Sequence, residues 1–452
     1  MKEKINIASG QGFWGDLIDA PIHQAAKGDI DYLMMDYLAE VTMSILQKQK
    51  IKNPLLGYAR DIPVLMKRLL PLLKSKKFKV ITNGGGVNPL ACRDAIFDTA
   101  KKLGIKDVRI GVVVGDDILS RIDELINSGV KLNNMETGES AAQIKDKIVS
   151  ANVYLGAGPV VQALKQGADI VITGRVTDTG LTLAPMIHEF GWAENNWNLL
   201  AAGTIAGHIL ECGAQAAGGN FLGDWESIPD LARVGFPIAE AHRNGDIYIT
   251  KHPGTGGQVS VETVSEQLVY EIGNPKGYIT PDCVADFTSV KLEQQGENRV
   301  RIYDIKGTPA TEYYKVSMSY YDGYNAFGTL TYSAPDALKR AQAADKILRT
   351  RLEDIGLKFD EIRTEFVGYN SCFGPLAKKY DPNEVVLRIG VRSKVKATIE
   401  RFSKELAPLI LTGPPGATGF SGGRPKASEV VAFWPALIPK AIVEPKVIVE
   451  SI

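Results

Sequence analysis

Residues 79–104 read KVITNGGGVNPLACRDAIFDTAKKLG, and this stretch decides the fold class. Its first six residues, KVITNG, have the β-branched character of a buried strand, and three glycines then supply a turn. The segment from Leu90 to Leu103 repeats apolar residues at helical spacing, and Gly104 suits the C-cap of that helix. A strand, a glycine turn and a helix make the first part of a βαβ unit. We therefore predict a parallel sheet with crossover helices.

The same alternation recurs through the first half of the chain. Four more apolar runs are expected strands: INIAS (5–9), YLMMDYL (32–38), VRIGVVV (108–114) and DIVITG (169–174). Beyond about residue 235 the sequence instead alternates apolar and polar residues, as half-buried antiparallel strands do. The predicted fold class is α/β: an N-terminal domain at 1–232 with a mainly parallel sheet flanked by helices, followed by a smaller α+β domain at 233–452 with antiparallel strands.

Composition excludes several classes of protein. The chain has 452 residues, enough for two or three domains, and its 52 Lys plus Arg balance its 52 Asp plus Glu. This balance argues against a nucleic-acid or membrane-surface binder. The four cysteines lie far apart, without zinc-ligand spacing, as suits a reducing compartment. With no export segment and no membrane-spanning run visible, we expect a soluble cytoplasmic protein.

The richest candidate site is GHILECGAQAAGGNF, residues 207–221. His208, Glu211 and Gln215 stand at i, i+3 and i+7, which places them on one helix face. We predict that Glu211 is a general acid or base with His208 as its partner, and that Gln215 and Asn220 bind substrate. Two alternatives remain open: a polar patch at a domain contact, and a metal site completed by a ligand from elsewhere.

A second candidate is TGRVTDTG, residues 173–180, directly after an expected strand. Arg175 and Asp178 would lie where a strand end meets a helix start. Ligands of open α/β sheets bind at such an edge, and an arginine there forks onto a carboxylate or phosphate. The alternative is an internal ion pair between the two side chains that braces the loop, and both roles are compatible.

Two loops complete the predicted site. Asn83 could orient a carbonyl group while the amides of Gly84 and Gly85 hold an oxyanion, although tight turns alone also explain the glycines. The loop KHPGTGG supplies Lys251 and His252 as a lid or anion clamp, or is an ordinary hairpin-type loop. Neither glycine turn matches a dinucleotide or ATP fingerprint.

No cofactor is predicted, with a divalent cation as the alternative. Paired carboxylates at Asp116 and Asp117, or the side chain of His208, are the candidate ligands.

Several motifs together resemble the acyclic terpene utilisation (AtuA-type) family. They are ASGQGFWGD (8–16), NGGGVNP (83–89), TGRVTDTGLTLAP (173–185), GHILECGAQAAGGNF (207–221), KHPGTGG (251–257) and TGPPGATGFSGGRP (412–425). The resemblance covers most of the chain and implies an α/β domain followed by a smaller α+β region. It also implies a link to the catabolism of branched, often CoA-linked acids. Larger members of that family carry a further ferredoxin-like domain, which elsewhere is a separate small protein. We therefore expect a small ferredoxin-like partner subunit.

Together these features predict a catabolic enzyme acting on a carboxylic acid or acyl-CoA, a lyase of the hydratase or dehydratase type. Water addition or removal next to a carbonyl needs a base, an acid and donors that stabilise an enolate, and the polar residues above supply all three. The alternative is a non-catalytic ligand-binding or scaffold subunit that needs the small partner. We also expect a homo-oligomer.

Overall fold

The computed structural model describes residues 2–452, and they form two compact units. The main unit comprises the chain up to Ser319 together with Phe433–Ile452, and the second unit is Tyr320–Ala432. This division differs from the predicted boundary between residues 232 and 233. The first two strands that follow residue 233 extend the main sheet rather than begin a new domain, as their pairing shows.

Five parallel strands form the centre of the main sheet. In sheet order they are β1 (Lys4–Gln11), β2 (Tyr32–Met35), β3 (Lys79–Thr82), β6 (Ile170–Thr173) and β4 (Arg109–Val114). The predicted parallel strands are present, as the centre of a larger mixed sheet, and each of them overlaps an expected apolar run. Nearly every residue of β2 and β6 is buried, as expected for strands covered on both faces.

Antiparallel strands extend this sheet at both edges. Beyond β1 come β7 (Ile238–His242), β8 (Ile247–Thr250), β12 (Arg299–Tyr303) and β11 (Lys291–Gly296), and beyond β4 lies β19 (Lys446–Ser451). The antiparallel strands predicted after residue 235 are therefore present, and five of them, β7, β8, β11, β12 and β19, belong to a ten-stranded mixed sheet.

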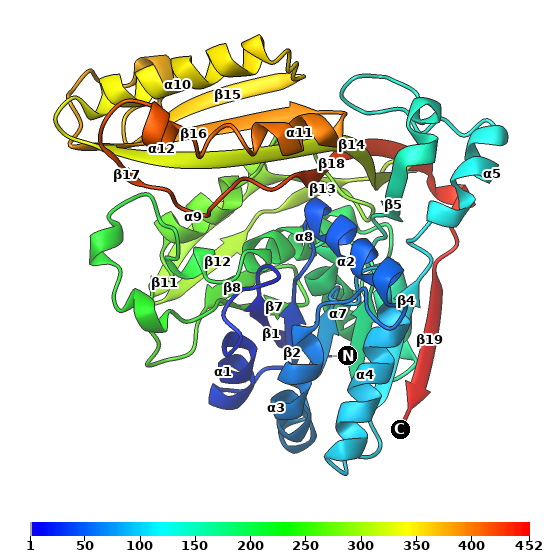
Figure 1. Cartoon of the computed structure of the whole chain (residues 1–452). Coiled ribbons are helices and arrows are strands. Elements are labelled where there is room, and N and C mark those ends of the chain that lie inside the picture. The colour runs from blue at the N-terminus through cyan, green and yellow to red at the C-terminus, as the bar shows by residue number, and fades with distance from the viewer. Residues whose placement is uncertain (1) are drawn as a thin grey trace. The chain divides into compact units, whose positions relative to one another are not determined.

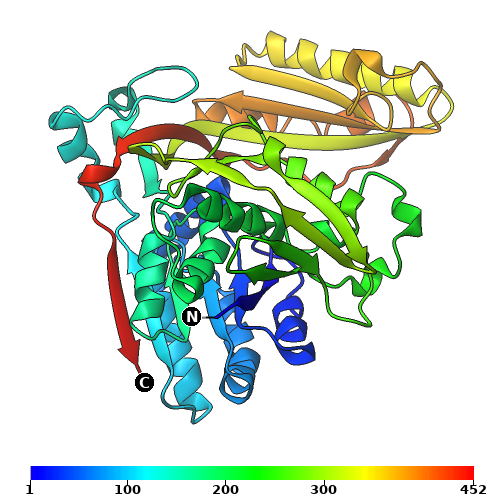
Figure 2. The ribbon, with the colours of Figure 1, turned by 180° about the vertical axis from the view of Figure 1, so that it is seen from behind.

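Helices cover both faces of the parallel centre. One group contains α1 (Ala20–Lys27), α3 (Asp61–Lys76) and α4 (Pro89–Lys102); the other contains α6 (Gly158–Lys165), α7 (Gly180–Phe190) and α8 (Trp197–Glu211). Figure 1 shows the first group in front of the sheet, and Figure 2, seen from behind, shows α7 and α8 in front. Helix α8 is buried along most of its length, which explains its run of alanine and glycine.

The remaining elements of the main unit surround the carboxyl ends of the parallel strands or the sheet edges. They are α2 (Glu40–Lys52), α5 (Ile122–Asn127), β5 (Ile148–Val153), α9 (Val261–Val269) and a small sheet of β9 (Tyr278–Ile279), β10 (Val284–Asp286) and β13 (Lys306–Thr308). Two long strands, β14 (Tyr313–Ser333) and β18 (Ser428–Pro439), lead from one unit into the other.

The second unit has a ferredoxin-like topology of its own. Its elements are β14, α10 (Ala337–Asp354), β15 (Glu361–Val367), β16 (Glu384–Ser393), α11 (Lys396–Phe402), α12 (Leu409–Thr412) and β17 (Ala417–Gly419). The antiparallel strand order β17–β14–β16–β15 with intervening helices is the split β-α-β arrangement. Helix α10 buries residues at helical spacing against this sheet: Ala337, Ala341, Ala344, Leu348 and Leu352.

No helix within residues 2–452 combines the length and the apolar character needed to cross a membrane.

Candidate functional site

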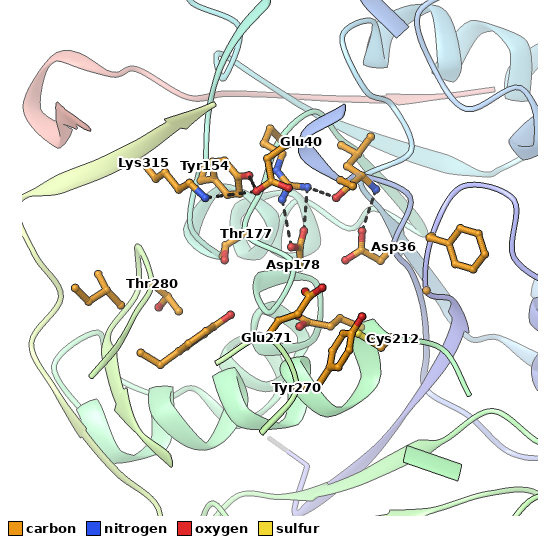
Figure 3. A pocket seen from close by; sticks show the side chains of 18 of the residues that line it. Asp36, Glu40, Tyr154, Thr177, Asp178, Cys212, Tyr270, Glu271, Thr280 and Lys315 are labelled. Atoms are coloured by element: carbon orange, nitrogen blue, oxygen red, sulfur yellow. Dashed lines mark hydrogen bonds and ion pairs between the residues drawn. The ribbon is translucent and has the colours of Figure 1, made fainter. Parts of the chain in front are cut away.

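A cavity of about 970 Å³ opens where the parallel strands of the main unit end. Loops after β1, β2 and β6 supply Gly12, Asp36 and Arg175, and the end of α8 supplies Glu211. More distant segments close the remaining wall, among them residues 270–281 and the start of β14. The strand-end rule thus places the cavity correctly. Figure 3 shows acidic and aromatic side chains facing into it.

Arg175 is held rigidly at the floor of this cavity. Its Nη1 donates to the carbonyl of Leu38 at 2.5 Å, and Asp178 accepts from Nη2 at 3.2 Å and lies 3.0 Å from Nη1. The guanidinium also stacks over the ring of Tyr154, 4.2 Å from its centroid. The side chain is only 3% exposed. The predicted contact between Arg175 and Asp178 that braces the loop is therefore present, and it uses much of the donor capacity of the arginine.

The loop that carries Arg175 rests on a buried carboxylate. Asp116 accepts the backbone N–H of Arg175 at 2.8 Å and the side-chain amide of Asn152 at 2.9 Å, and burial raises its pKa to about 6. A Cβ at Gly174 would lie 2.4 Å from Asp116 Oδ1, so this turn requires glycine. Asp116 therefore has a structural role, while its neighbour Asp117 lies 4.0 Å from Lys50.

Two carboxyl groups of the cavity hold their protons unusually tightly. Burial raises the pKa of Asp36 to about 6, against the opposing effects of Arg175 and of a 2.6 Å hydrogen bond from Asn83. Burial also raises the pKa of Asp178 well above its usual range, and nearby Asp36 and Glu211 add to this although Arg175 opposes it. Asp178 keeps 31% of its side chain exposed, toward the cavity. It is therefore suited to donating a proton near neutral pH.

Glu211 and His208 form a dyad at the end of α8. Glu211 Oε1 lies 2.8 Å from His208 Nδ1, and the other ring nitrogen, Nε2, is 2.9 Å from the carbonyl of Gln267. Burial lowers the pKa of His208, but the charge and hydrogen bond of Glu211 outweigh it and the net shift is upward. Glu211 lines the cavity, whereas His208 stands behind it. The helical spacing thus predicted the pair correctly but not the position of the histidine.

Gln215 and Asn220 line the same cavity and belong to one amide network. Asn220 donates to Gln215 Oε1 at 2.9 Å, and Gln215 donates to the side-chain oxygen of Gln267 at 3.0 Å. Gln267 in turn donates to the carbonyl of His208 at 2.9 Å. The network therefore fixes the end of α8, on which Glu211 sits.

The glycine turn after β3 does not line the cavity. Asn83 bonds Asp36 and accepts the N–H of Tyr37 at 2.8 Å, so it supports the acid rather than a ligand. A Cβ at Gly84 would lie 2.3 Å from Ile62, and one at Gly85 would lie 2.5 Å from the carbonyl of Thr173. Close packing accounts for these glycines, and the structure places the predicted oxyanion site outside the cavity lining.

Lys251 and His252 are also absent from the cavity lining. Lys251 Nζ donates to the carbonyl of Thr255 at 2.8 Å, and His252 Nε2 lies 3.0 Å from the carbonyl of Gln24. Burial lowers the pKa of both side chains. The structure therefore gives this loop internal contacts instead of the predicted role as a clamp over the site.

The described residues include no group of three or more His, Cys, Asp or Glu side chains arranged to hold a metal ion. Three acids of the cavity lie instead within ion-pair distance of a basic side chain: Asp178 of Arg175, Glu211 of His208 and Glu40 of Lys315.

Sequence reasoning missed one side of the cavity. Glu40 Oε1 accepts the hydroxyl of Tyr154 at 2.8 Å and lies 3.4 Å from Lys315 Nζ. Burial raises the pKa of Glu40, but the hydrogen bond from Tyr154 and the nearby cations lower it on balance. These three residues come from α2, the end of β5 and β14, and no local motif connects them. The sequence does indicate a site position for Asp36, because this residue directly follows the buried strand YLMM and so stands at a strand end.

Comparison with known proteins places the chain in a family. The family model described as acyclic terpene utilisation family protein AtuA matches residues 5–449. No curated protein and no solved structure matches the chain. Because the match spans nearly all of the 452 residues, the chain belongs to the acyclic terpene utilisation family, AtuA.

Proposed function

We propose that this chain is a hydro-lyase that adds water to, or removes it from, a branched carboxylic acid or its thioester. Family membership indicates a role in acyclic terpene utilisation. One observation carries the finer proposal: Asp36, Asp178 and Glu211 line a single cavity but have different surroundings. Pairs of acids whose environments separate their proton affinities are the usual means of running acid and base chemistry together.

The proposed division of roles follows from these surroundings. Glu211, held by His208, takes a proton from the carbon next to the substrate carbonyl. Asp178, whose pKa is raised by burial, donates its proton to the departing hydroxyl group. The C–H and C–O bonds break, a C=C bond forms, and water leaves; hydration is the reverse. The charge of Arg175 stabilises Asp178 after it has given up its proton.

The shape of the cavity supports a branched acyl group as the substrate. The lining also includes apolar side chains, namely Phe13, Leu38, Met135, Ile279 and Leu437. The volume of about 970 Å³ lies at the upper end of the usual range for small-molecule sites. A hydrocarbon chain could pack against these apolar side chains while the polar end of the same molecule meets the acids.

The test is turnover on a panel of branched 3-hydroxy acids, 2-enoic acids and their thioesters, followed by NMR for gain or loss of water. Asp178→Asn keeps the shape but removes the proton, so the rate should fall at least about 100-fold. Asp123→Asn on α5 is the matched control, since that side chain is 77% exposed and lies outside the cavity lining.

Two results would count against the proposal: no water addition or removal on any member of the panel, or full activity of Asp178→Asn. The alternative, a non-catalytic ligand-binding or scaffold subunit, predicts binding of panel members without turnover. Adding a small ferredoxin-like partner protein to the same assay would then reveal whether turnover needs that subunit.

A further inference from the structure

Acidic side chains outnumber basic side chains in the lining of the cavity. Six lining side chains are acids, namely Asp16, Asp36, Glu40, Asp178, Glu211 and Glu271, and Arg175 and Lys315 are the cations of the same lining. Such a site repels a polyanion. It binds a singly charged anion only where a basic side chain has an N–H donor that is not already used. The two cations therefore decide which substrate charge the cavity accepts.

Arg175 has little to offer a ligand. It is 3% exposed, its two terminal nitrogens contact Leu38 and Asp178, and its planar face covers Tyr154. Its remaining side-chain nitrogen, Nε, is buried. A substrate carboxylate would have to displace Asp178 to reach the two terminal nitrogens of the Arg175 guanidinium group.

Lys315 has a different setting. Its side chain is 40% exposed, and its ammonium group lies 3.4 Å from Glu40 Oε1, a long ion pair. That carboxylate oxygen already accepts a shorter hydrogen bond of 2.8 Å from Tyr154. An ammonium group has three N–H donors, so Lys315 can keep Glu40 and still bind a second oxygen.

Aromatic rings fix the position of this ammonium group. Lys315 Nζ lies 4.9 Å from the centroid of Tyr154 and 5.6 Å from that of Phe433. Both rings attract the cation through their π faces. The backbone is also fixed, because Tyr154 donates its N–H to the carbonyl of Lys315 at 2.9 Å. A long, flexible side chain is thereby held in place at the cavity wall.

We propose that Lys315 determines substrate specificity by binding a free carboxylate of the substrate, and that the cavity accepts a singly charged acid in preference to a CoA thioester. Figure 3 shows Lys315 on the far side of Asp178 from Asp36, so the anion would lie away from Asp36. The nucleotide of CoA carries several phosphate charges, which the ionised acids among the lining residues oppose. This inference rests on the proposed function, because it takes the cavity as the substrate site.

The experiment measures binding without turnover, in the Glu211→Gln background, by calorimetry. The probes are an acyclic monoterpenoid acid, its methyl ester, its primary amide and its CoA thioester. Lys315→Gln should weaken binding of the acid by about ten- to a hundredfold, since it removes a charged hydrogen bond, and should leave the ester and amide unchanged. Lys315→Arg should restore acid binding in part.

Lys339→Gln on α10 is the control, since that lysine is 81% exposed and outside the cavity lining. Thermal unfolding of each variant shows that the fold is intact. Three results would overturn the inference: no binding of the acid, equal loss of acid and ester binding in Lys315→Gln, or tighter binding of the CoA thioester than of the acid. Lys315-dependent acid binding by a wild-type chain with no turnover would instead retain this inference and reject the hydro-lyase.

Discussion

His208 Nδ1 lies 2.8 Å from Glu211 Oε1, while Nε2 of the same ring faces the carbonyl of Gln267 at 2.9 Å. A carbonyl only accepts, so Nε2 carries a proton in either charge state of the ring. The two charge states of the ring therefore differ by the proton on Nδ1, the nitrogen that faces Glu211. This pair joins the helix end to the cavity and gives the site its proposed base.

Glu211→Gln should lower the pKa of His208 to below its ordinary value. Without the Glu211 charge, burial becomes the main influence on the ring, and burial lowers the pKa of a histidine. NMR titration can follow this, because the chain has five histidines. A His208 pKa unchanged by the substitution would show that Glu211 is not what holds the proton on the ring.

Arg175→Lys should destabilise the chain by about 2–4 kcal/mol, because an ammonium group cannot bond Leu38 and Asp178 while stacking on Tyr154. The matched control is Arg233→Lys, whose side chain is 81% exposed and should change stability by under about 0.5 kcal/mol. Urea unfolding compares the two variants. Equal losses of stability in the two variants would mean that the buried guanidinium group of Arg175 contributes nothing to stability beyond its charge.

Asp36→Asn should alter the dependence of stability on pH. The folded pKa of Asp36, about 6, lies above the ordinary 3.8, so between these values the folded chain keeps a proton that the unfolded chain has lost. Stability therefore falls as pH rises through this window, by about 2–3 kcal/mol for this group. Asp36→Asn should lose less stability between pH 4 and pH 7 than wild type or Asp123→Asn. Parallel curves for all three would contradict the raised pKa.

Gly85→Ala should destabilise the fold, because the new Cβ would lie 2.5 Å from the carbonyl of Thr173 in the neighbouring strand end. Gly273→Ala is the control, since nothing lies within 4 Å of its Cβ position. The expected loss is about 1–3 kcal/mol, measured by thermal unfolding. If Gly85→Ala kept full stability but lost ligand binding, the turn would be part of the site after all.

Much of the fold was predictable because local patterns determine it. Strands such as β2 and β6 are buried on both faces and read as apolar runs, and their carboxyl ends had to share one edge. The division of the chain into its two compact units was not predictable from the sequence. β7 pairs with β1 across more than two hundred residues, and nothing in either strand's own sequence specifies that neighbour.

The site was predictable where one helix or one strand end carries it. Helical spacing placed Glu211 beside His208, and the strand-end rule placed Arg175 and Asp178. Lys315 could not be found in this way, because it reaches Glu40 from 275 residues along the chain. The glycine-rich loop after β8 made Lys251 a candidate, but its ammonium group bonds its own loop.

Hydrogen–deuterium exchange at the substrate carbon next to the carbonyl tests the central claim most directly. With a branched 3-hydroxy acid or its thioester in D₂O, the wild-type chain should incorporate deuterium at that carbon, as followed by NMR. Glu211→Gln should slow this exchange by at least about 100-fold, because it removes the base that takes the proton. The surface control Glu124→Gln, 68% exposed, should exchange at the wild-type rate. Exchange at the wild-type rate in Glu211→Gln would contradict the account.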